Sequence, residues 1–166
     1  MSSDPRIAIS KAEGLARAGK KEEAMALAKE LVDQYPGEME VWSLRGYLHA
    51  LSRDYAKAVA DLGRAIGINS AEPVLFYDRG RYSLALGDDL AAVSDFTTGL
   101  ELCEFHDNDY YRESLHFLRA EALLRLGRKR EAIVDLAQVR GDFKTWTYRL
   151  RTKADLLAEL SKLPNE

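Results

Sequence analysis

Residues 41–70, VWSLRGYLHALSRDYAKAVADLGRAIGINS, decide the fold of this chain. An aromatic residue, Trp42, is followed four residues later by Gly46, and Ala58 and Ala65 come after the polar Arg53-Asp54 pair. These gaps are those of a two-helix hairpin whose arms meet through small side chains, which let helix axes approach closely. The stretch therefore predicts two helices joined by a tight turn.

The same pattern recurs before and after this stretch. Ala24, Ala58 and Ala92 are evenly spaced along the chain. The next step, from Ala92 to Ala132, is longer than the others, so six additional residues lie near 104–109. Other pairs separated by the regular step are Gly46 with Gly80, Trp42 with Phe76, and Leu62 with Phe96. Four copies at a period of about 34 residues indicate a repeat protein whose units stack side by side.

The period and the order of Trp, Gly, Tyr and Ala residues resemble those of the tetratricopeptide repeat (TPR) family. The resemblance implies an all-α fold, a TPR-type right-handed α-solenoid of four helix-turn-helix hairpins with a C-terminal capping helix, in one domain over residues 1–166. The expected repeats are residues 5–38, 39–72, 73–106 and 113–142.

Helix ends are readable in each unit. Asp4-Pro5 gives an N-cap followed by proline at the first helical position. Gly19, Gly87 and Gly127 mark the turns inside three hairpins, where glycine permits a positive φ. The tail after residue 140 breaks the period, but its apolar residues follow steps of three and four. We therefore expect a capping helix over residues 143–163, anchored by Trp146.

A basic residue precedes the small residue of each first helix, where leucine is usual in the family. In three units an aspartate follows at one fixed spacing, whereas Lys11 has Leu27 at that spacing. Arginine and aspartate thus occur together or not at all, which predicts partly buried bidentate ion pairs that are architectural and not catalytic. The predicted pairs are Arg45–Asp61, Arg79–Asp95 and Arg119–Asp135.

The resemblance also implies a groove lined by the inner faces of the first helices. Tyrosine and arginine carry much of the binding energy at protein interfaces. The alternative is a solvated wall that happens to include such residues. The predicted groove residues are Arg17, Tyr47, Leu51, Tyr77, Arg81, Leu84, Phe117, Glu121 and Arg125.

Composition excludes several other function classes. The net charge of −3 gives no reason to expect nucleic-acid binding. The N-terminus has no apolar run typical of a signal peptide, and no apolar run long enough to span a membrane occurs, so we expect a cytoplasmic chain without a membrane segment. Cys103 is the only cysteine, and His49 and His116 have no metal-ligand spacing, so we predict packed side chains and no metal. No cofactor motif or catalytic cluster appears.

The sequence therefore predicts a non-catalytic TPR scaffold or adaptor that grips a protein or peptide, with the arginines favouring an acidic or mixed segment. The lysine, asparagine and arginine clamp of TPR domains that bind chaperone tails is absent, because Ile9, Glu13, Leu44 and Tyr47 occupy the matching positions. The alternative is a stand-alone bacterial chaperone, or a neutralising, immunity-type partner of a secreted protein. The partner's identity and the oligomeric state do not follow from the sequence.

Overall fold

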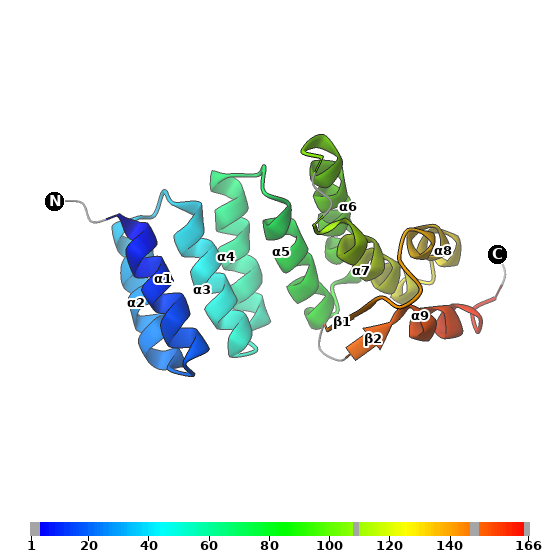
Figure 1. The fold of residues 1–166 in the computed structure, drawn as a ribbon, viewed down its shortest axis with the longest axis horizontal. Helices are drawn as coiled ribbons and strands as arrows, with labels where there is room; N and C mark the ends of the chain where they lie inside the picture. Colours follow the sequence, from blue (N-terminus) through cyan, green and yellow to red (C-terminus); the bar gives the residue numbers. More distant parts are fainter. Residues whose placement is uncertain (1–3, 108–109, 147–149, 165–166) are drawn as a thin grey trace. The chain divides into compact units, whose positions relative to one another are not determined.

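Pairs of helices joined by short turns make up most of the chain (Figure 1). The computed structural model describes residues 4–107, 110–146 and 150–164. The chain divides into two compact units, unit 1 with residues 1–71 and unit 2 with residues 72–166. The predicted fold class is confirmed by the helical hairpins in both units. One domain over residues 1–166 stays a prediction.

Unit 1 contains two hairpins. Asp4 caps the first helix, because its side chain accepts a hydrogen bond from the Arg6 backbone N–H at 3.0 Å. Asp54 caps the fourth helix through the Lys57 backbone N–H. Small residues lie where the arms cross, and Ala12, Ala24 and Ala58 are fully buried. The helices are α1 (Pro5–Arg17), α2 (Lys21–Gln34), α3 (Met39–Leu51) and α4 (Tyr55–Ile68).

Unit 2 contains two further hairpins and a C-terminal segment. Its core gathers Phe96, Leu115 and Leu118 around the crossing of the hairpins, all without exposed surface. The elements are α5 (Pro73–Leu86), α6 (Asp89–Phe105), α7 (Arg112–Arg125), α8 (Lys129–Ala137), β1 (Lys144–Trp146), β2 (Leu150–Thr152) and α9 (Lys153–Leu160).

The turns inside the hairpins behave as the sequence predicts. Gly19, Gly87 and Gly127 have φ angles of 79°, 82° and 74°, in the region that glycine adopts without steric cost. The remaining turn places Arg53 at a φ of 60°. A non-glycine residue thus accepts the same left-handed conformation in the second hairpin, at a cost that its neighbours offset.

The expected capping helix over 143–163 is wrong in its first half. Lys144–Trp146 and Leu150–Thr152 form an antiparallel β-hairpin, and the helix begins only at Lys153. Thr152 sets this start through a capping box, because its side chain accepts from the Asp155 N–H while the Asp155 carboxylate accepts from the Thr152 N–H. Thr145 and Trp146, which lie within the expected helix range, are of types that favour strands. The side chain of Trp146 lies outside the described part, so its anchoring role stays a prediction.

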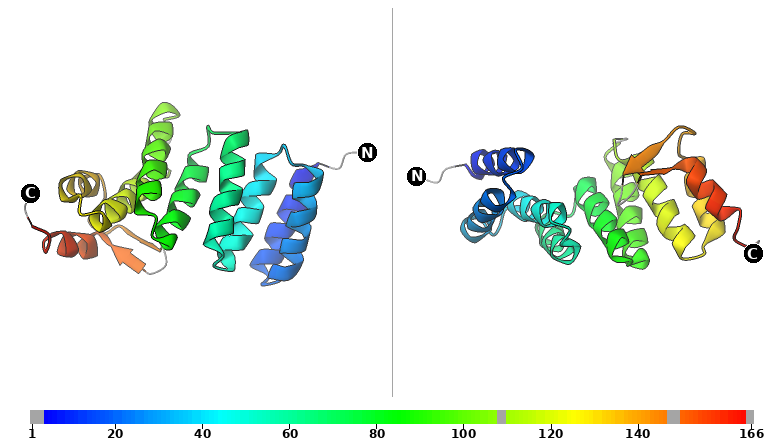
Figure 2. Two further views of the ribbon diagram at one scale, coloured as in Figure 1. Left: turned by 180° about the vertical axis from the view of Figure 1, so that it is seen from behind. Right: turned by 90° about the horizontal axis from the view of Figure 1, so that it is seen from below.

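Helix α9 packs against α7 and α8 of the last hairpin, and β2 contacts α9; Figure 2 shows these elements at the end of the chain. Leu156 and Leu160 of α9 are buried in the core of unit 2. Phe143, just before β1, stacks on Phe117 of α7 with ring centroids 5.2 Å apart. The C-terminal segment therefore closes the apolar surface of the last hairpin, which is the role predicted for the capping helix.

Candidate functional site

Helix α5 carries a cluster of aromatic and charged side chains. The Arg81 guanidinium lies over the Tyr77 ring at 5.2 Å and over the Tyr82 ring at 5.4 Å. Its Nη2 is 3.6 Å from Oδ1 of Asp78, one turn back on the same helix. Tyr77, Asp78 and Arg81 are all half-buried, so each keeps surface for a partner. Two of the predicted groove residues are thus brought together.

Tyr111 extends this cluster from a second element. Its ring lies 5.2 Å from that of Tyr77, although Tyr111 immediately precedes α7. The sequence reasoning missed this residue because it falls between the third and fourth repeats. The Tyr110-Tyr111 pair next to a repeat boundary was the available signal. We call Tyr77, Asp78, Arg81, Tyr82 and Tyr111 the Tyr77 cluster.

The electrostatics of the Tyr77 cluster favour a fixed positive charge. Burial alone would lower the pKa of Arg81, but the Asp78 carboxylate, the polar side chains of Tyr77 and Tyr82 and a hydrogen bond with Tyr77 raise it above its ordinary value. Burial raises the pKa of Asp78, and Arg81 only partly opposes this. Arg81 therefore stays charged at all accessible pH values, held between two rings beside a single carboxylate.

Three other predicted groove residues of unit 2 are buried, and their assignment to a partner surface is wrong. Leu84, Phe117 and Glu121 have at most 1% of their surface exposed. For Phe117 the cause is the C-terminal segment, since the Phe143 ring packs against it, whereas Leu84 is buried within the core of unit 2. The buried Arg151 of β2 also brings its Nε within 4.0 Å of the Glu121 carboxylate.

Arg125 is engaged within unit 2. Its Nη1 donates to the Leu84 carbonyl at 3.0 Å and to Asp89 Oδ1 at 3.3 Å. Its Nη2 donates to Glu121 Oε1 at 3.2 Å. Arg125 thus joins α5, α6 and α7, and we interpret it as a structural residue.

In unit 1 the predicted groove residues differ in availability. Arg17 has 70% of its side chain exposed and lies 3.6 Å from Glu13. Tyr47 is 42% exposed. Leu51 instead packs against the core of unit 1, and its carbonyl accepts a hydrogen bond from Lys21 Nζ at 3.2 Å. Arg17 and Tyr47 are the open members of the set.

The three arginine–aspartate pairs are present and have one geometry. In each, the arginine Nε and Nη2 donate to the two carboxylate oxygens of a buried aspartate, which is the bidentate arrangement of strong ion pairs. The Nε and Nη2 distances are 2.8 and 2.7 Å for Arg45–Asp61, 2.9 and 2.6 Å for Arg79–Asp95, and 2.8 and 2.7 Å for Arg119–Asp135.

Histidines join two of these pairs. His116 Nδ1 lies 2.8 Å from Asp135 Oδ1, and His49 Nε2 lies 3.8 Å from Asp61 Oδ2. Burial favours neutral His49 and lowers its pKa, against the opposing effect of Asp61. Burial also opposes the charge of Asp135, but hydrogen bonds from Arg119 and His116 outweigh it and lower the pKa of that carboxyl. Both histidines therefore belong to the packed architecture.

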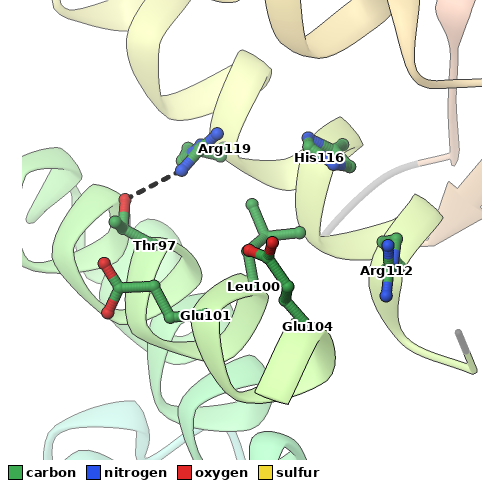
Figure 3. Close-up of a pocket in the computed structure, with 7 residues that line it drawn as sticks. All are labelled: Thr97, Leu100, Glu101, Glu104, Arg112, His116 and Arg119. Atoms are coloured by element: carbon green, nitrogen blue, oxygen red, sulfur yellow. Dashed lines mark hydrogen bonds between the residues drawn. The ribbon is translucent and has the colours of Figure 1, made fainter. Parts of the chain in front are cut away.

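Two adjoining hollows in unit 2 were not predicted. The first, of about 290 Å³, lies between α6 and α7, with Leu100, Glu101 and Glu104 on one side and Arg112 and His116 on the other (Figure 3). The second, of about 400 Å³, lies between α6, α7 and α8. Thr97 and Arg119 line both. Their residues come from two repeats, so a pattern search within one repeat does not reveal them.

Other chemistry is sparse within the described ranges. Cys103 is fully buried in the core of unit 2, as expected for an inert thiol. Among residues 4–107, 110–146 and 150–164, no group of histidine, cysteine and acidic side chains could hold a metal ion. In the same ranges no helix has the length and apolar character needed to span a bilayer.

Comparison with known families gives one match. Residues 6–37, which contain all of α2 and all of α1 except Pro5, match the family model described as a tetratricopeptide repeat. A comparison with curated protein sequences gives no match.

Solved structures with the same fold include two named proteins. The crystal structure of MamA protein matches with a TM-score of 0.72 and 13% identity, covering 80% of this chain and 69% of that one. YrrB, described as a TPR protein with an unusual peptide-binding site, matches with a TM-score of 0.69 and 18% identity over 79% of this chain. The match spans 64% of YrrB, less than two thirds of its length. At these identities the likeness concerns the fold.

Proposed function

We propose that this chain, a tetratricopeptide repeat protein, is a non-catalytic scaffold that grips a protein or peptide segment at the Tyr77 cluster of unit 2. The observation that carries the proposal is the half-buried group of Tyr77, Arg81 and Tyr111. Tyrosine and arginine side chains are common interface anchors, and those already packed against neighbours lose little conformational freedom on binding.

The fold supports binding and not catalysis. Fold alone does not set function, but the peptide-binding site named for YrrB gives a precedent for this architecture. Arg81 and Asp135, two groups with shifted pKa values, each lie in an ion pair, which is the pattern of structural charge networks.

The chemistry of the partner follows from what the Tyr77 cluster leaves available. Tyr77 and Tyr111 pack against each other and are both half-buried, so the ring surface that they leave accessible suits an apolar or aromatic side chain. Arg81 offers a charge that Asp78 compensates only at 3.6 Å, outside hydrogen-bond distance. The proposed segment therefore carries an apolar anchor next to a carboxylate that Arg81 binds in place of water.

Photo-crosslinking tests the proposal directly. Benzoylphenylalanine is placed at Tyr77 in one variant and at Lys57, exposed on α4, in another, and each is irradiated in an extract of the native host. We expect position 77 to capture a defined protein whose cross-linked peptide contains an apolar and an acidic residue, and position 57 to capture none of it. Equal capture of that protein at both positions, or capture at neither, would refute the assignment.

The narrower role as a chaperone or neutralising partner of a secreted protein stays a prediction. It requires the captured protein to be a secreted one. Identification of the cross-linked protein by mass spectrometry therefore decides between this role and that of a general adaptor.

A further inference from the structure

The two hollows of unit 2 lie next to each other and are separated by Arg119 and Thr97. Arg119 Nη1 donates to Thr97 Oγ1 at 3.1 Å, and this hydrogen bond is drawn in Figure 3. Because both residues line each hollow, their contact forms the boundary between the hollows. A chain crossing this boundary could place one side chain in each hollow.

The cations of the first hollow are already engaged inside the protein. Arg119 uses Nε and Nη2 for Asp135 and Nη1 for Thr97. His116 also contacts Asp135, and Arg112 donates to the Cys103 carbonyl at 3.4 Å. The charge of Arg119 is therefore compensated by Asp135, and Arg112 is the one further guanidinium among the described residues that line this hollow.

The carboxylates of the first hollow are in the opposite situation. Glu101 and Glu104 lie three residues apart on α6, so they share one face of the helix. Within residues 4–107, 110–146 and 150–164, neither makes an ion pair or a side-chain hydrogen bond, and both are exposed. The charge available in this hollow is negative, which suits a cationic side chain.

The second hollow is more apolar. Val93, Leu123 and Val134 contribute to its lining, and Val134 has 65% of its surface exposed. Its charged pair cancels internally, because Arg128 donates to both carboxylate oxygens of Glu131. An apolar side chain seated there would cover Val134, which otherwise faces water.

We propose that the adjoining hollows bind a partner segment that carries an arginine or lysine beside an apolar residue. The cation lies against Glu101 and Glu104, and arginine is favoured because its planar fork can meet carboxylates with paired hydrogen bonds. The apolar side chain lies between Val93 and Val134. Volumes of about 290 and 400 Å³ are at the small end for ligand pockets, roughly 300–1,000 Å³, and suit single side chains.

The surface formed by the two hollows is separate from the Tyr77 cluster, on which the proposed function rests. It shares no residue with the Tyr77 cluster, and its charge preference is the reverse of that of Arg81. Binding at the two surfaces can therefore fail or succeed independently.

The test uses two pools of short fluorescein-labelled peptides in a glycine–serine background. One pool carries an arginine and a leucine at every relative spacing, and the other carries glutamate in place of arginine. Fluorescence anisotropy with the full chain should show saturable binding of the arginine pool and weaker binding of the glutamate pool. The double variant Glu101→Lys/Glu104→Lys should weaken arginine-pool binding roughly tenfold, as expected for losing two exposed ion pairs and adding repulsion. Val134→Ser, which removes apolar surface from the second hollow without adding charge, should also weaken it.

Glu30→Lys/Asp33→Lys is the matched control, because it makes the same charge change at the same spacing on an exposed face of α2. It should leave binding of the arginine pool unchanged, as should Tyr77→Ala. Circular dichroism melting curves confirm that each variant is folded. Absence of arginine-pool binding up to about 1 mM would overturn the proposal. Equal binding of both pools, or equal loss in the α2 control, would also overturn it.

Discussion

Helices α5 and α7 carry equivalent repeat positions in different surroundings. Tyr77 and Arg81 of α5 correspond to Phe117 and Glu121 of α7 when the six additional residues are allowed for. The α5 residues are half-buried and available, whereas the α7 residues are buried under the C-terminal segment. Repeat position thus sets where a side chain points, but what packs next to the hairpin decides whether a partner can reach it.

The architectural positions do not differ in this way. The arginine–aspartate pairs have nearly the same donor–acceptor distances in the second, third and fourth hairpins. Each arginine–aspartate contact is made between the two helices of one hairpin. The contrast between inner-face and architectural positions yields four predictions for stability.

The largest expected loss of stability follows from weakening the packing of helix α9 against α7. Leu156→Ala removes a fully buried leucine of α9 and should lower the free energy of unfolding of unit 2 by about 2–5 kcal/mol. Leu157→Ala, at the next residue, removes a side chain that is 44% exposed and should cost less than about 1 kcal/mol. Urea denaturation followed by circular dichroism measures both. Similar costs at both positions would mean that α9 does not pack as described.

Breaking the ion pairs should lower the free energy of unfolding by a smaller amount, and by a similar amount in the two units. Asp61→Ala and Asp95→Ala each leave an arginine without its bidentate partner. Because each arginine remains partly exposed and can recruit water, we expect a loss of about 1–3 kcal/mol. Denaturant titrations give the two values. A cost near zero for one pair and a large cost for the other would show that the pairs are not equivalent.

Two equivalent glycines should respond differently to alanine. A Cβ at Gly80 would lie 2.5 Å from Cε1 of the buried Phe96, whereas at Gly46 the nearest atom would be the Ala58 carbonyl oxygen at 3.3 Å. We expect Gly80→Ala to destabilise by about 1–2 kcal/mol through overpacking. The higher helix propensity of alanine, worth about 1 kcal/mol, should offset the tighter contact at Gly46. Thermal unfolding of both variants tests the difference, which the reverse order would contradict.

The smallest effect is a pH dependence in unit 1. The folded state lowers the pKa of His49, so the unfolded chain binds the proton at higher pH. Stability should therefore be lost as the pH falls from above the ordinary value of about 6.5 through the lowered pKa of His49. Denaturation between about pH 8 and about pH 5 should show this slope in the parent and less of it in His49→Gln. His106→Gln, at an exposed site after α6, is the control and should keep the slope.

Much of the fold could be predicted because local rules and the repeat agree. Gly87 needs a positive φ, Ala92 must be small, and Asp95 must face Arg79, and each requirement is visible in the spacing alone. The tail was harder, because its apolar residues fit a helical period while the capping box at Thr152 delays the helix. The capping box at Thr152 lies inside this periodic stretch and sets the residue at which helix α9 begins.

The candidate site was predictable only in part. Tyr77 and Arg81 followed from repeat position, but Phe117 is covered by Phe143, which lies outside any regular repeat position. Tyr111 joins the site because the additional residues between α6 and α7 bring a ring against Tyr77. Contacts between segments that occupy different repeat positions leave no periodic pattern in the sequence. Neither the burial of Phe117 under Phe143 nor the contribution of Tyr111 could therefore be predicted from the pattern of one repeat.

The most direct test of the central claim is the affinity of the captured partner for variants of the Tyr77 cluster. Isothermal titration calorimetry should show that Tyr77→Ala weakens binding by about 1–2 kcal/mol, as expected for an interface anchor. Arg81→Glu should weaken binding more at low salt than at high salt, because charges are screened only weakly at low salt. Lys57→Glu should bind like the parent. A partner that binds the Tyr77 and Arg81 variants as tightly as the parent but loses the Lys57 variant would contradict the account.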